Sequence, residues 1–499
     1  MDQDRASGNG REFSRLRRTL WPIHAYELKK FLPMLLMFFF ISLVYSLLRN
    51  TKDTLIVTAP GGGADLIPFL KVYGVIPMSI LYMLVYARLS NALGKRRLFS
   101  VALAPFLVFF AGFAFLFPVR EALQPHWGAA LPPGLASLAA LVRHWVSCLF
   151  YVMAELWGSV ALSLLFWTFA NDIVKVEESR RFYALFGIGA NLALIAVKVA
   201  NQLIHVLERH LLRRWPMEAW TAYVILLMAV VVLSIAAILL IYRWIHREVL
   251  TDPRFFTPDE RRAQRAARPR MTLREAFRFL SRSRYLLCIA VMVIGYGIAI
   301  NLIEVTWKTH LGLLHPDPQD YQDFMADFSL ATGTVTLFLM LFVANNVIRV
   351  HGWTVAALAT PVVLLVTGAG FFGFILFEDA SAPLLAKVGS TPLAAAVLFG
   401  TIQNVLSKAT KYSLFDPTKE MAYIPLDPES KVKGKAAIDV VGARLGKAGG
   451  SIIQQGLIAC FHSLRAVPGE IAGILLLVIG AWIWAARSLG RAYARLTRP

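Results

Sequence analysis

The sequence predicts an all-α polytopic membrane protein with about twelve transmembrane helices. Of its 499 residues, 57% are hydrophobic and only 16% are charged, whereas soluble domains are about 45–50% apolar and about 25% charged. The apolar residues also lie in blocks of roughly 18 to 25 residues, the length that a helix needs to cross about 30 Å of hydrocarbon. Lysine and arginine fall mainly between these blocks, as in membrane proteins.

The predicted spans form two sets of six around a long hydrophilic stretch. The first set covers about 31–48, 69–87, 98–118, 146–169, 183–206 and 219–241, and the second about 285–305, 326–345, 353–377, 385–407, 436–460 and 468–486. We therefore expect a cytoplasmic segment 1–30, a six-helix half 31–241, a basic cytoplasmic linker 242–284, a second half 285–486 and a cytoplasmic tail 487–499. This is a major-facilitator-like arrangement, with a substrate site between the halves near the midplane.

The net charge of +20 indicates topology and not nucleic-acid binding, because the basic residues lie in loops between apolar blocks. Their bias predicts that both termini and the linker are cytoplasmic. The helical spacing of Leu273, Ala276, Phe277 and Leu280 predicts an interfacial helix in the linker, with anchoring favoured over a regulatory role. The leader, 1–30, contains acidic residues and no signal cleavage site, which favours a bacterial cytoplasmic (inner) membrane over a plastid.

The sequence contains no recognisable catalytic motif. The glycines at 61–63 are not followed by Lys-Ser/Thr, and the segment 442–448 is one residue too short for a phosphate-binding loop. The histidines and the three cysteines show no metal-ligand spacing. We therefore expect no metal and no cofactor, and a protein that moves a solute with existing gradients.

Three charged residues are predicted within or near the ends of spans, where charge is costly and usually faces a cavity or a partner. Glu155 is the only ionisable residue of the block 146–169, so it is either a coupling carboxylate or a structural partner for a basic residue. Glu304 and Lys308 are four residues apart, which suits an intrahelical pair as well as a role in a site. All three are candidates for charge coupling or gating.

Two basic pairs at helical spacing of three predict a phosphate-binding site. Arg49 and Lys52 end the first span, and Arg444 and Lys447 lie in the eleventh. Solvated helix ends are the alternative for such residues, but 436–460 offers little route to water. Because like charges repel and unpaired buried charges cost several kcal/mol per ion, an anionic ligand is expected; Arg supplies a bidentate fork and Lys a point charge for phosphate.

A nucleobase would need an aromatic face and amide edges. Candidates by position are Tyr151, Tyr296, Asn301 and Asn404, together with Trp157 and Gln403. The alternative is that the aromatic residues pack in the helix bundle or anchor it at the interface.

Four segments resemble signatures of the nucleotide (ATP/ADP) transporter family of intracellular bacteria and plastids. They read TKDTLIVT at 51–58, EVTWK at 304–308, FDPTKEMAYIPL at 415–426 and KGKAAIDVV at 433–441. The resemblance implies a major-facilitator-like carrier, and it places the charged residues regarded as functional in the family on Lys52, Glu155, Glu304 and Lys447.

The resemblance implies an antiporter that exchanges external ATP for internal ADP by alternating access, with or without phosphate. A proton-coupled nucleotide or NAD importer is the alternative within transport, and a non-transporting membrane scaffold or sensor is the alternative outside it. An ATP-hydrolysing pump is disfavoured by the missing motif. The expected partners are ATP, ADP, phosphate as a co-substrate and the lipid bilayer, with no nucleic acid, and the expected oligomeric state is a monomer.

Overall fold

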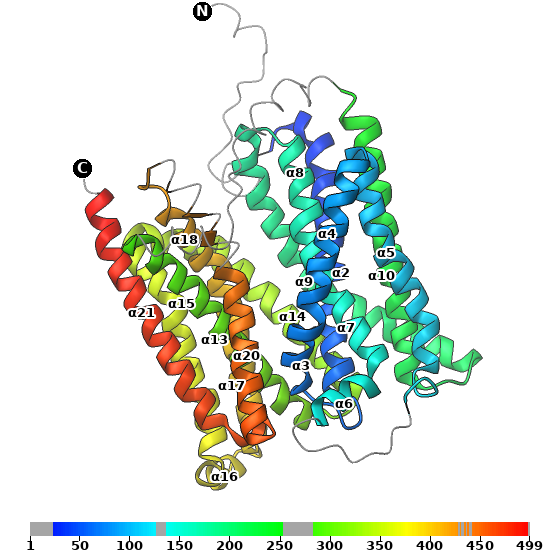
Figure 1. Cartoon of the computed structure of the whole chain (residues 1–499), viewed down its shortest axis with the longest axis vertical. Helices are drawn as coiled ribbons and strands as arrows, with labels where there is room; N and C mark the ends of the chain where they lie inside the picture. Colours follow the sequence, from blue (N-terminus) through cyan, green and yellow to red (C-terminus); the bar gives the residue numbers. More distant parts are fainter. Residues whose placement is uncertain are drawn as a thin grey trace, which may run out of the picture.

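The computed structural model describes residues 23–125, 136–252, 283–427, 430, 434–435, 437–438 and 442–497. Every regular element in this part of the chain is a helix, and the helices lie in two bundles side by side (Figure 1). The all-α membrane fold class is therefore confirmed. The predicted interfacial helix at 273–280 lies outside the described residues, as does most of the segment 1–30.

The helices follow one another along the chain in two groups. The first bundle contains α2 (Leu28–Val57), α3 (Leu66–Phe69), α4 (Ile76–Ala92), α5 (Lys95–Leu116), α6 (Ala136–Arg143), α7 (Trp145–Trp157), α8 (Trp167–Ile173), α9 (Val176–Arg214) and α10 (Ala219–Trp244). The second part of the chain contains α13 (Arg284–Leu314), α14 (Pro318–Phe338), α15 (Ala344–Leu376), α16 (Glu378–Ala386), α17 (Pro392–Thr410), α18 (Asp416–Ala422), α20 (Ala443–Phe461) and α21 (Pro468–Thr497). Wider π-helical turns join or extend several of them: η2 (Leu70–Val75), η5 (Gly158–Phe166), η6 (Ile245–Val249), η7 (Leu339–Val343) and η8 (Lys411–Phe415).

Ten helices in the described part of the chain are long and apolar enough to cross a membrane. The other two expected spans, 385–407 and 436–460, fall on α17 and α20, which are helical but less apolar. The reason lies in their polar residues. Gln403, Asn404 and Lys408 of α17 are buried in the protein, as are Ser451 and Gln454 of α20.

The buried apolar residues form two main cores, one drawn mostly from each half of the chain, and the second also takes in Ile56, Leu66 and Tyr151 of the first half. The first core is rich in aromatic residues such as Phe110, Phe113 and Trp157, and the second is centred on residues such as Trp307 and Trp482. By contrast, many large apolar residues are exposed, as expected for helices that face lipid. We propose that these two cores correspond to the halves 31–241 and 285–486.

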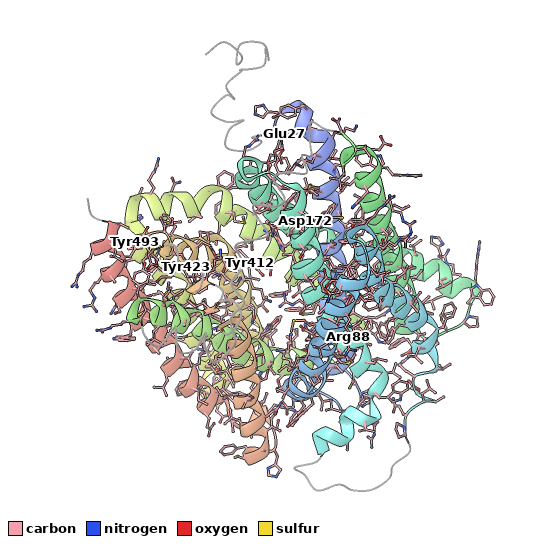
Figure 2. All side chains as sticks on the ribbon, turned by 45° about the horizontal axis from the view of Figure 1, so that its top comes forward. Glu27, Arg88, Asp172, Tyr412, Tyr423 and Tyr493 are labelled. Atoms are coloured by element: carbon pink, nitrogen blue, oxygen red, sulfur yellow. The ribbon has the colours of Figure 1, made fainter. Side chains whose placement is uncertain are left out.

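The first residues of α2 and the last residues of α21 lie at the same end of the molecule (Figure 1). We call this the terminal end, and the opposite end, where α2 ends and α21 begins, the distal end. Glu27, just before α2, lies at the terminal end of the first bundle, whereas Tyr423 and Tyr493 belong to the second bundle (Figure 2).

The helix α14 packs against the first bundle although it belongs to the second half of the sequence. A ladder of hydrogen bonds fixes its register on α2: Asn50 Nδ2 donates to the Met325 carbonyl (3.0 Å), and Thr54 Oγ1 donates to Gln322 Oε1 (2.7 Å). Gly333 allows the backbones of α14 and α9 to approach closely, because a Cβ there would lie 2.8 Å from the Asn191 carbonyl. The seam between the halves is therefore built from small and polar residues, as is usual for helices that pack within a membrane.

Candidate functional site

A group of charged side chains lies where α2 of the first half meets α13 of the second. Arg49, Lys52 and Asp53 come from the distal part of α2, and Glu304 and Lys308 from α13. Every residue of α2 from Asn50 to Ile56 is buried, so the side chains in this stretch have only protein or substrate as partners. Burial makes ion pairs here strong in the sense that losing one partner is costly.

Asp53 connects the two halves at the centre of this group. Its Oδ1 lies 2.8 Å from Lys52 Nζ and its Oδ2 lies 2.7 Å from Lys308 Nζ, and the side chain is completely buried. Because the two lysines come from α2 and α13, a single carboxylate holds one cation from each half.

One carboxylate oxygen of Glu304 lies close to three cations. Its Oε1 lies 2.6 Å from Arg49 Nη2, 3.3 Å from Lys308 Nζ and 3.5 Å from Lys408 Nζ. Lys408 is supplied by α17 and its ammonium also lies 4.5 Å from the centre of the Phe328 ring. One carboxylate cannot neutralise three cations, so this part of the group carries excess positive charge.

Glu155 of α7 is the third carboxylate of the group. Its Oε1 lies 3.1 Å from Lys52 Nζ, and its side chain is 28% exposed, more than that of Asp53 or Glu304. The same ammonium lies 4.0 Å from the centre of the Tyr151 ring, a cation–π contact. Glu155 is thus the carboxylate of the group with the freest access to an exchanging solute or to water.

Lys71, in the turn η2, adds a fifth cation. Its Nζ donates a hydrogen bond to Asn301 Oδ1 (2.5 Å), and Asn301 Nδ2 donates to Ser451 Oγ of α20 (2.8 Å). Within the part of the chain that the structure describes, Lys71 makes no ion pair. The central group therefore holds five cations, Arg49, Lys52, Lys71, Lys308 and Lys408, against the carboxylates of Asp53, Glu155 and Glu304. This balance suits a multiply charged anion such as a polyphosphate.

Arg444 and Lys447 stand in the first turn and a half of α20, but their side chains lie outside the described residues. The backbone of α20 is close to the central group, because a Cβ on Gly450 would lie 2.8 Å from Nδ2 of Asn301, the residue that accepts the Lys71 hydrogen bond. The second predicted phosphate pair therefore starts on a helix that borders the group, and its assigned role stays a prediction.

The residues predicted to bind a nucleobase lie in different surroundings. Tyr151 is buried beneath the Lys52 ammonium, and the Tyr296 ring stacks on Phe415 with centroids 5.6 Å apart. Asn404 Nδ2 donates to the Gly400 carbonyl of its own helix, whereas its Oδ1 is buried without a hydrogen-bond partner in the described chain. That oxygen is a free acceptor in the second core.

Trp157 and Gln403 make structural contacts. The Trp157 indole donates to the Ile41 carbonyl (3.1 Å), and Gln403 Nε2 donates to the Leu364 carbonyl (3.3 Å). Both contacts tie neighbouring helices together. Gln403 Oε1, like Asn404 Oδ1, is buried without a hydrogen-bond partner in the described chain, so a role of these residues in binding a nucleobase stays a prediction.

Four residues of the central region were not predicted from the sequence: Asp53, Lys71, Lys408 and Tyr412. Asp53 stands beside Lys52 in the sequence, and Lys408 ends an apolar block, so both resembled ordinary residues at a helix end. Tyr412 is 46% exposed, with the Lys411 ammonium 4.3 Å from its ring centre, and it is close enough to Arg49 to interact electrostatically. For Asp53, Lys71 and Lys408, the sequence signal that could have identified them is a charged side chain in or next to an apolar helix.

A second group of polar residues joins the halves towards the distal end. His205 of α9 contacts Asp323 of α14 through Nε2 (2.7 Å) and Glu208 through Nδ1 (2.9 Å), and Gln319 Nε2 donates to Glu208 Oε1 (2.6 Å). We call the residues His205, Glu208, Gln319 and Asp323 the distal latch.

Two further hydrogen bonds join the halves at the same end. Ser463 Oγ donates to Asp65 Oδ2 (2.8 Å) and Gln455 Nε2 to the Pro68 carbonyl (2.9 Å). Burial raises the pKa of the Asp65 carboxyl, an effect that the Ser463 hydrogen bond partly offsets. In this structure the halves are therefore tied together at the distal end.

Comparison with solved structures supports the fold. A D-xylose–proton symporter aligns with a TM-score of 0.54 at 15% identity, over 93% of this chain and 97% of that one. A bacterial homologue of the iron transporter ferroportin, solved in an inward-facing state, aligns with a TM-score of 0.52 at 12% identity, over 95% and 100% of the two chains. At these identities the likeness concerns the arrangement of helices alone.

Sequence comparison gives nearer relatives. The chain is 51% identical over 488 residues to ADP,ATP carrier protein 1 of Chlamydia pneumoniae, covering 96% of this chain and 94% of the relative. It is 46% identical over 477 residues to the chloroplastic ADP,ATP carrier protein 1 of Arabidopsis thaliana, covering 94% and 75%. It is 41% identical over 499 residues to ADP,ATP carrier protein 1 of Rickettsia bellii, covering 96% of each. Residues 6–493 match the sequence profile of that group, and the chain belongs to the TLC ATP/ADP transporter family.

Proposed function

We propose that this protein is an ADP,ATP antiporter that imports ATP in exchange for ADP. The observation that carries the proposal is the excess of cations in the central group, which lies between the two halves of a transporter fold. Relatives that are 41–51% identical over nearly the whole chain are named ADP,ATP carriers. A nucleotide polyphosphate supplies the anions that the central group lacks.

We assign the phosphate contacts to Lys52, Arg49 and Lys408, with Arg444 and Lys447 completing the site from α20. Asp53, Glu155 and Glu304 hold the cations when no nucleotide is bound. Arriving phosphates displace some of these ion pairs, because an arginine or lysine forms charge-assisted hydrogen bonds with phosphate as well as with carboxylate. The halves then exchange the side on which the site is open.

The carboxylates also explain obligatory exchange. In the empty carrier, Asp53 and Glu304 pair with cations from both halves, and moving the halves apart would separate buried charges at a cost of several kcal/mol. A bound nucleotide replaces these pairs during the movement. Exchange of ATP for ADP transfers about one net negative charge, worth about 2.3 kcal/mol per 100 mV, and export of phosphate with ADP would reduce this electrical term.

The chain is a multi-pass membrane protein, and we propose that it lies in a bacterial cytoplasmic membrane with both termini inside. The distribution of lysine and arginine supports this orientation. The terminal end then faces the cytoplasm and the distal end faces outward, so the distal latch closes the outer side. One chain supplies the whole central group, which supports a monomer as the working unit.

Exchange is tested with purified protein in liposomes. Labelled ATP uptake should be rapid with internal ADP and at least about tenfold slower without it, because the empty carrier returns slowly. A proton ionophore should leave the exchange unchanged, and internal phosphate tests co-export. Uptake that needs a proton gradient and no internal nucleotide would instead identify a proton-coupled importer. No nucleotide flux under any condition would favour a scaffold or sensor.

The distal latch gives a prediction for the conformational cycle. Asp323→Asn removes the charge that faces His205, which should weaken closure of the distal end by about 1 kcal/mol, because the pair is partly exposed. Spin labels at the exposed residues Arg214 and Lys387 should report a growing long-distance population, by about fivefold. Asp320→Asn, an exposed change on the same helix, is the matched control. Identical distance distributions for both variants would show that the latch does not hold the end closed.

A further inference from the structure

Four arginines gather around a cavity at the terminal end of the first bundle, away from the central group. The cavity has a volume of about 640 Å³ and is lined by Arg96 and Arg97 of α5 and by Arg243 and Arg247 of α10 and η6, together with Ser100, Val101 and Tyr242. Within the described part of the chain, none of the four arginines makes an ion pair. We propose that this cavity binds the phosphate headgroup of an anionic phospholipid.

Aromatic contacts support the Tyr242 side of the cavity. The Tyr242 ring stacks on Phe99 with centroids 4.1 Å apart and an interplanar angle of 7°, and it also contacts the His246 ring at 4.3 Å. The π-helical turn η6 follows α10 directly and places Arg243 and Arg247 on the same side. Such turns within helices occur frequently at functional sites.

Further positive character comes from the backbone of α5. This helix of 22 residues begins at Lys95, and although the Arg97 N–H donates to the Gly94 carbonyl, the helix dipole favours an anion at the same place as Arg96 and Arg97. The acidic residues nearby are few. Asp172 is within electrostatic reach of Tyr242 and lies in the first bundle (Figure 2), and Glu248 neighbours Arg247 in sequence. The arginines outnumber these carboxylates.

The surface beside the cavity identifies the ligand as a lipid. On α5, Val101, Val108 and Phe115 follow one another at a spacing of seven and are 40%, 71% and 81% exposed. On α10, Leu233 and Leu240 have the same spacing and are 68% and 62% exposed. Both apolar stripes lead along membrane-spanning helices to the arginines. A molecule with apolar tails and an anionic head matches this pattern, whereas a soluble phosphate uses only the cavity.

The depth of the cavity agrees with this assignment. The two spans that form it begin at Arg96 and end at Val249, which places the four arginines at the boundary between hydrocarbon and water. Trp244, 41% exposed, stands at the same level of α10, where tryptophan is enriched in membrane proteins. Basic pockets between transmembrane helices are known sites for phospholipid headgroups.

The test measures the binding of dioleoyl phosphatidylglycerol and dioleoyl phosphatidylcholine to the purified full chain by native mass spectrometry. Wild type should prefer phosphatidylglycerol, and Arg243→Ala/Arg247→Ala should weaken its binding by about 10- to 30-fold, since each cation near an anionic headgroup contributes several-fold. Arg213→Ala/Arg214→Ala, an equal loss of charge on exposed residues at the distal end of α9, should leave it unchanged. Arg243→Lys/Arg247→Lys should retain most of the binding.

A competition experiment distinguishes a lipid headgroup from a soluble phosphate as the ligand of the cavity. Millimolar inorganic phosphate or glycerol 3-phosphate should displace little bound phosphatidylglycerol, because neither reaches the apolar stripes. Equal lipid binding by wild type and the double alanine variant would overturn the proposal. Complete displacement by inorganic phosphate would overturn the lipid assignment in favour of a soluble anion. Thermal unfolding in phosphatidylcholine checks that the variants are folded. If the alanine variant is not folded, Arg243→Gln/Arg247→Gln, which removes both charges but keeps polar side chains, takes its place and should weaken the binding to the same extent.

Discussion

Replacing Glu304 with glutamine should lower ATP–ADP exchange by about 100-fold or more while nucleotide still binds. Glu304 Oε1 is shared by Arg49, Lys308 and Lys408, so glutamine leaves three neighbouring cations without a counter-charge. In the empty state these cations repel one another, and the halves lose an ion pair that spans the seam. No carboxylate is then left at this position to take the cations back when the nucleotide leaves, so the step that should suffer is release of the nucleotide and not its capture.

Nucleotide binding should become tighter in the same variant. Removing a carboxylate that lies roughly 7 Å from a bound phosphate removes about 2 kcal/mol of repulsion at an effective dielectric constant of about 20, which corresponds to an affinity gain of about 30-fold. Calorimetric titration of ATP in detergent measures the affinity, and counterflow in liposomes measures the exchange. The affinity for ATP should therefore increase while the rate of exchange decreases.

The control for this variant is Glu470→Gln, an exposed carboxylate in the first turn of α21. It should change neither affinity nor exchange. If Glu304→Gln weakens ATP binding as strongly as it lowers exchange, Glu304 contacts the nucleotide directly or organises the site, and its assignment as a counter-charge is wrong. Exchange close to wild type would remove Glu304 from the mechanism altogether.

The fold class could be predicted from the sequence because membrane helices need long apolar blocks, and those blocks are visible one at a time. Two expected spans, α17 and α20, are less apolar than the others because polar residues on them face the protein or the seam and not lipid. Such helices are recognised by their length and by their position between more apolar spans. Their hydropathy changes little at either end, so the sequence does not define where they begin and end. Inward-facing polarity is a property of the assembled bundle, which the sequence of one helix does not reveal.

The central group was only partly predictable. Glu155 and Glu304 stand out as charges within apolar blocks, and Lys52 and Lys308 as charges close to the end of one, which is a local signal. Their pairing is not local, since Arg49 and Glu304 are 255 residues apart. Arg49 was predicted to bind phosphate, and in the structure it holds Glu304 at 2.6 Å, an arrangement that a substrate could exchange for its own contacts. Asp53 was overlooked because an acid beside a lysine at a helix end resembles an ordinary surface pair.

Asp53→Asn should destabilise the folded protein by about 3–5 kcal/mol and abolish exchange. Asp53 is fully buried and holds Lys52 at 2.8 Å and Lys308 at 2.7 Å, and removal of one partner from a buried ion pair leaves uncompensated charge in a medium of low polarity. Thermal unfolding in detergent should show a Tm lower by roughly 5 °C or more. Asp379→Asn, an exposed change in the first turn of α16, should leave Tm unchanged.

A second substitution separates charge balance from transport. In Asp53→Asn/Lys308→Met the group loses one negative and one positive charge together, while Lys52 keeps Glu155 and Glu304 keeps Arg49 and Lys408. Most of the lost stability should return, because replacing a complete buried ion pair by uncharged groups is often neutral. Exchange should stay low, since no carboxylate then joins Lys52 of the first half to a lysine of the second. Recovery of both stability and exchange would mean that Asp53 only balances charge, and a single variant as stable as wild type would mean that the buried pair is not a pair at all in the membrane.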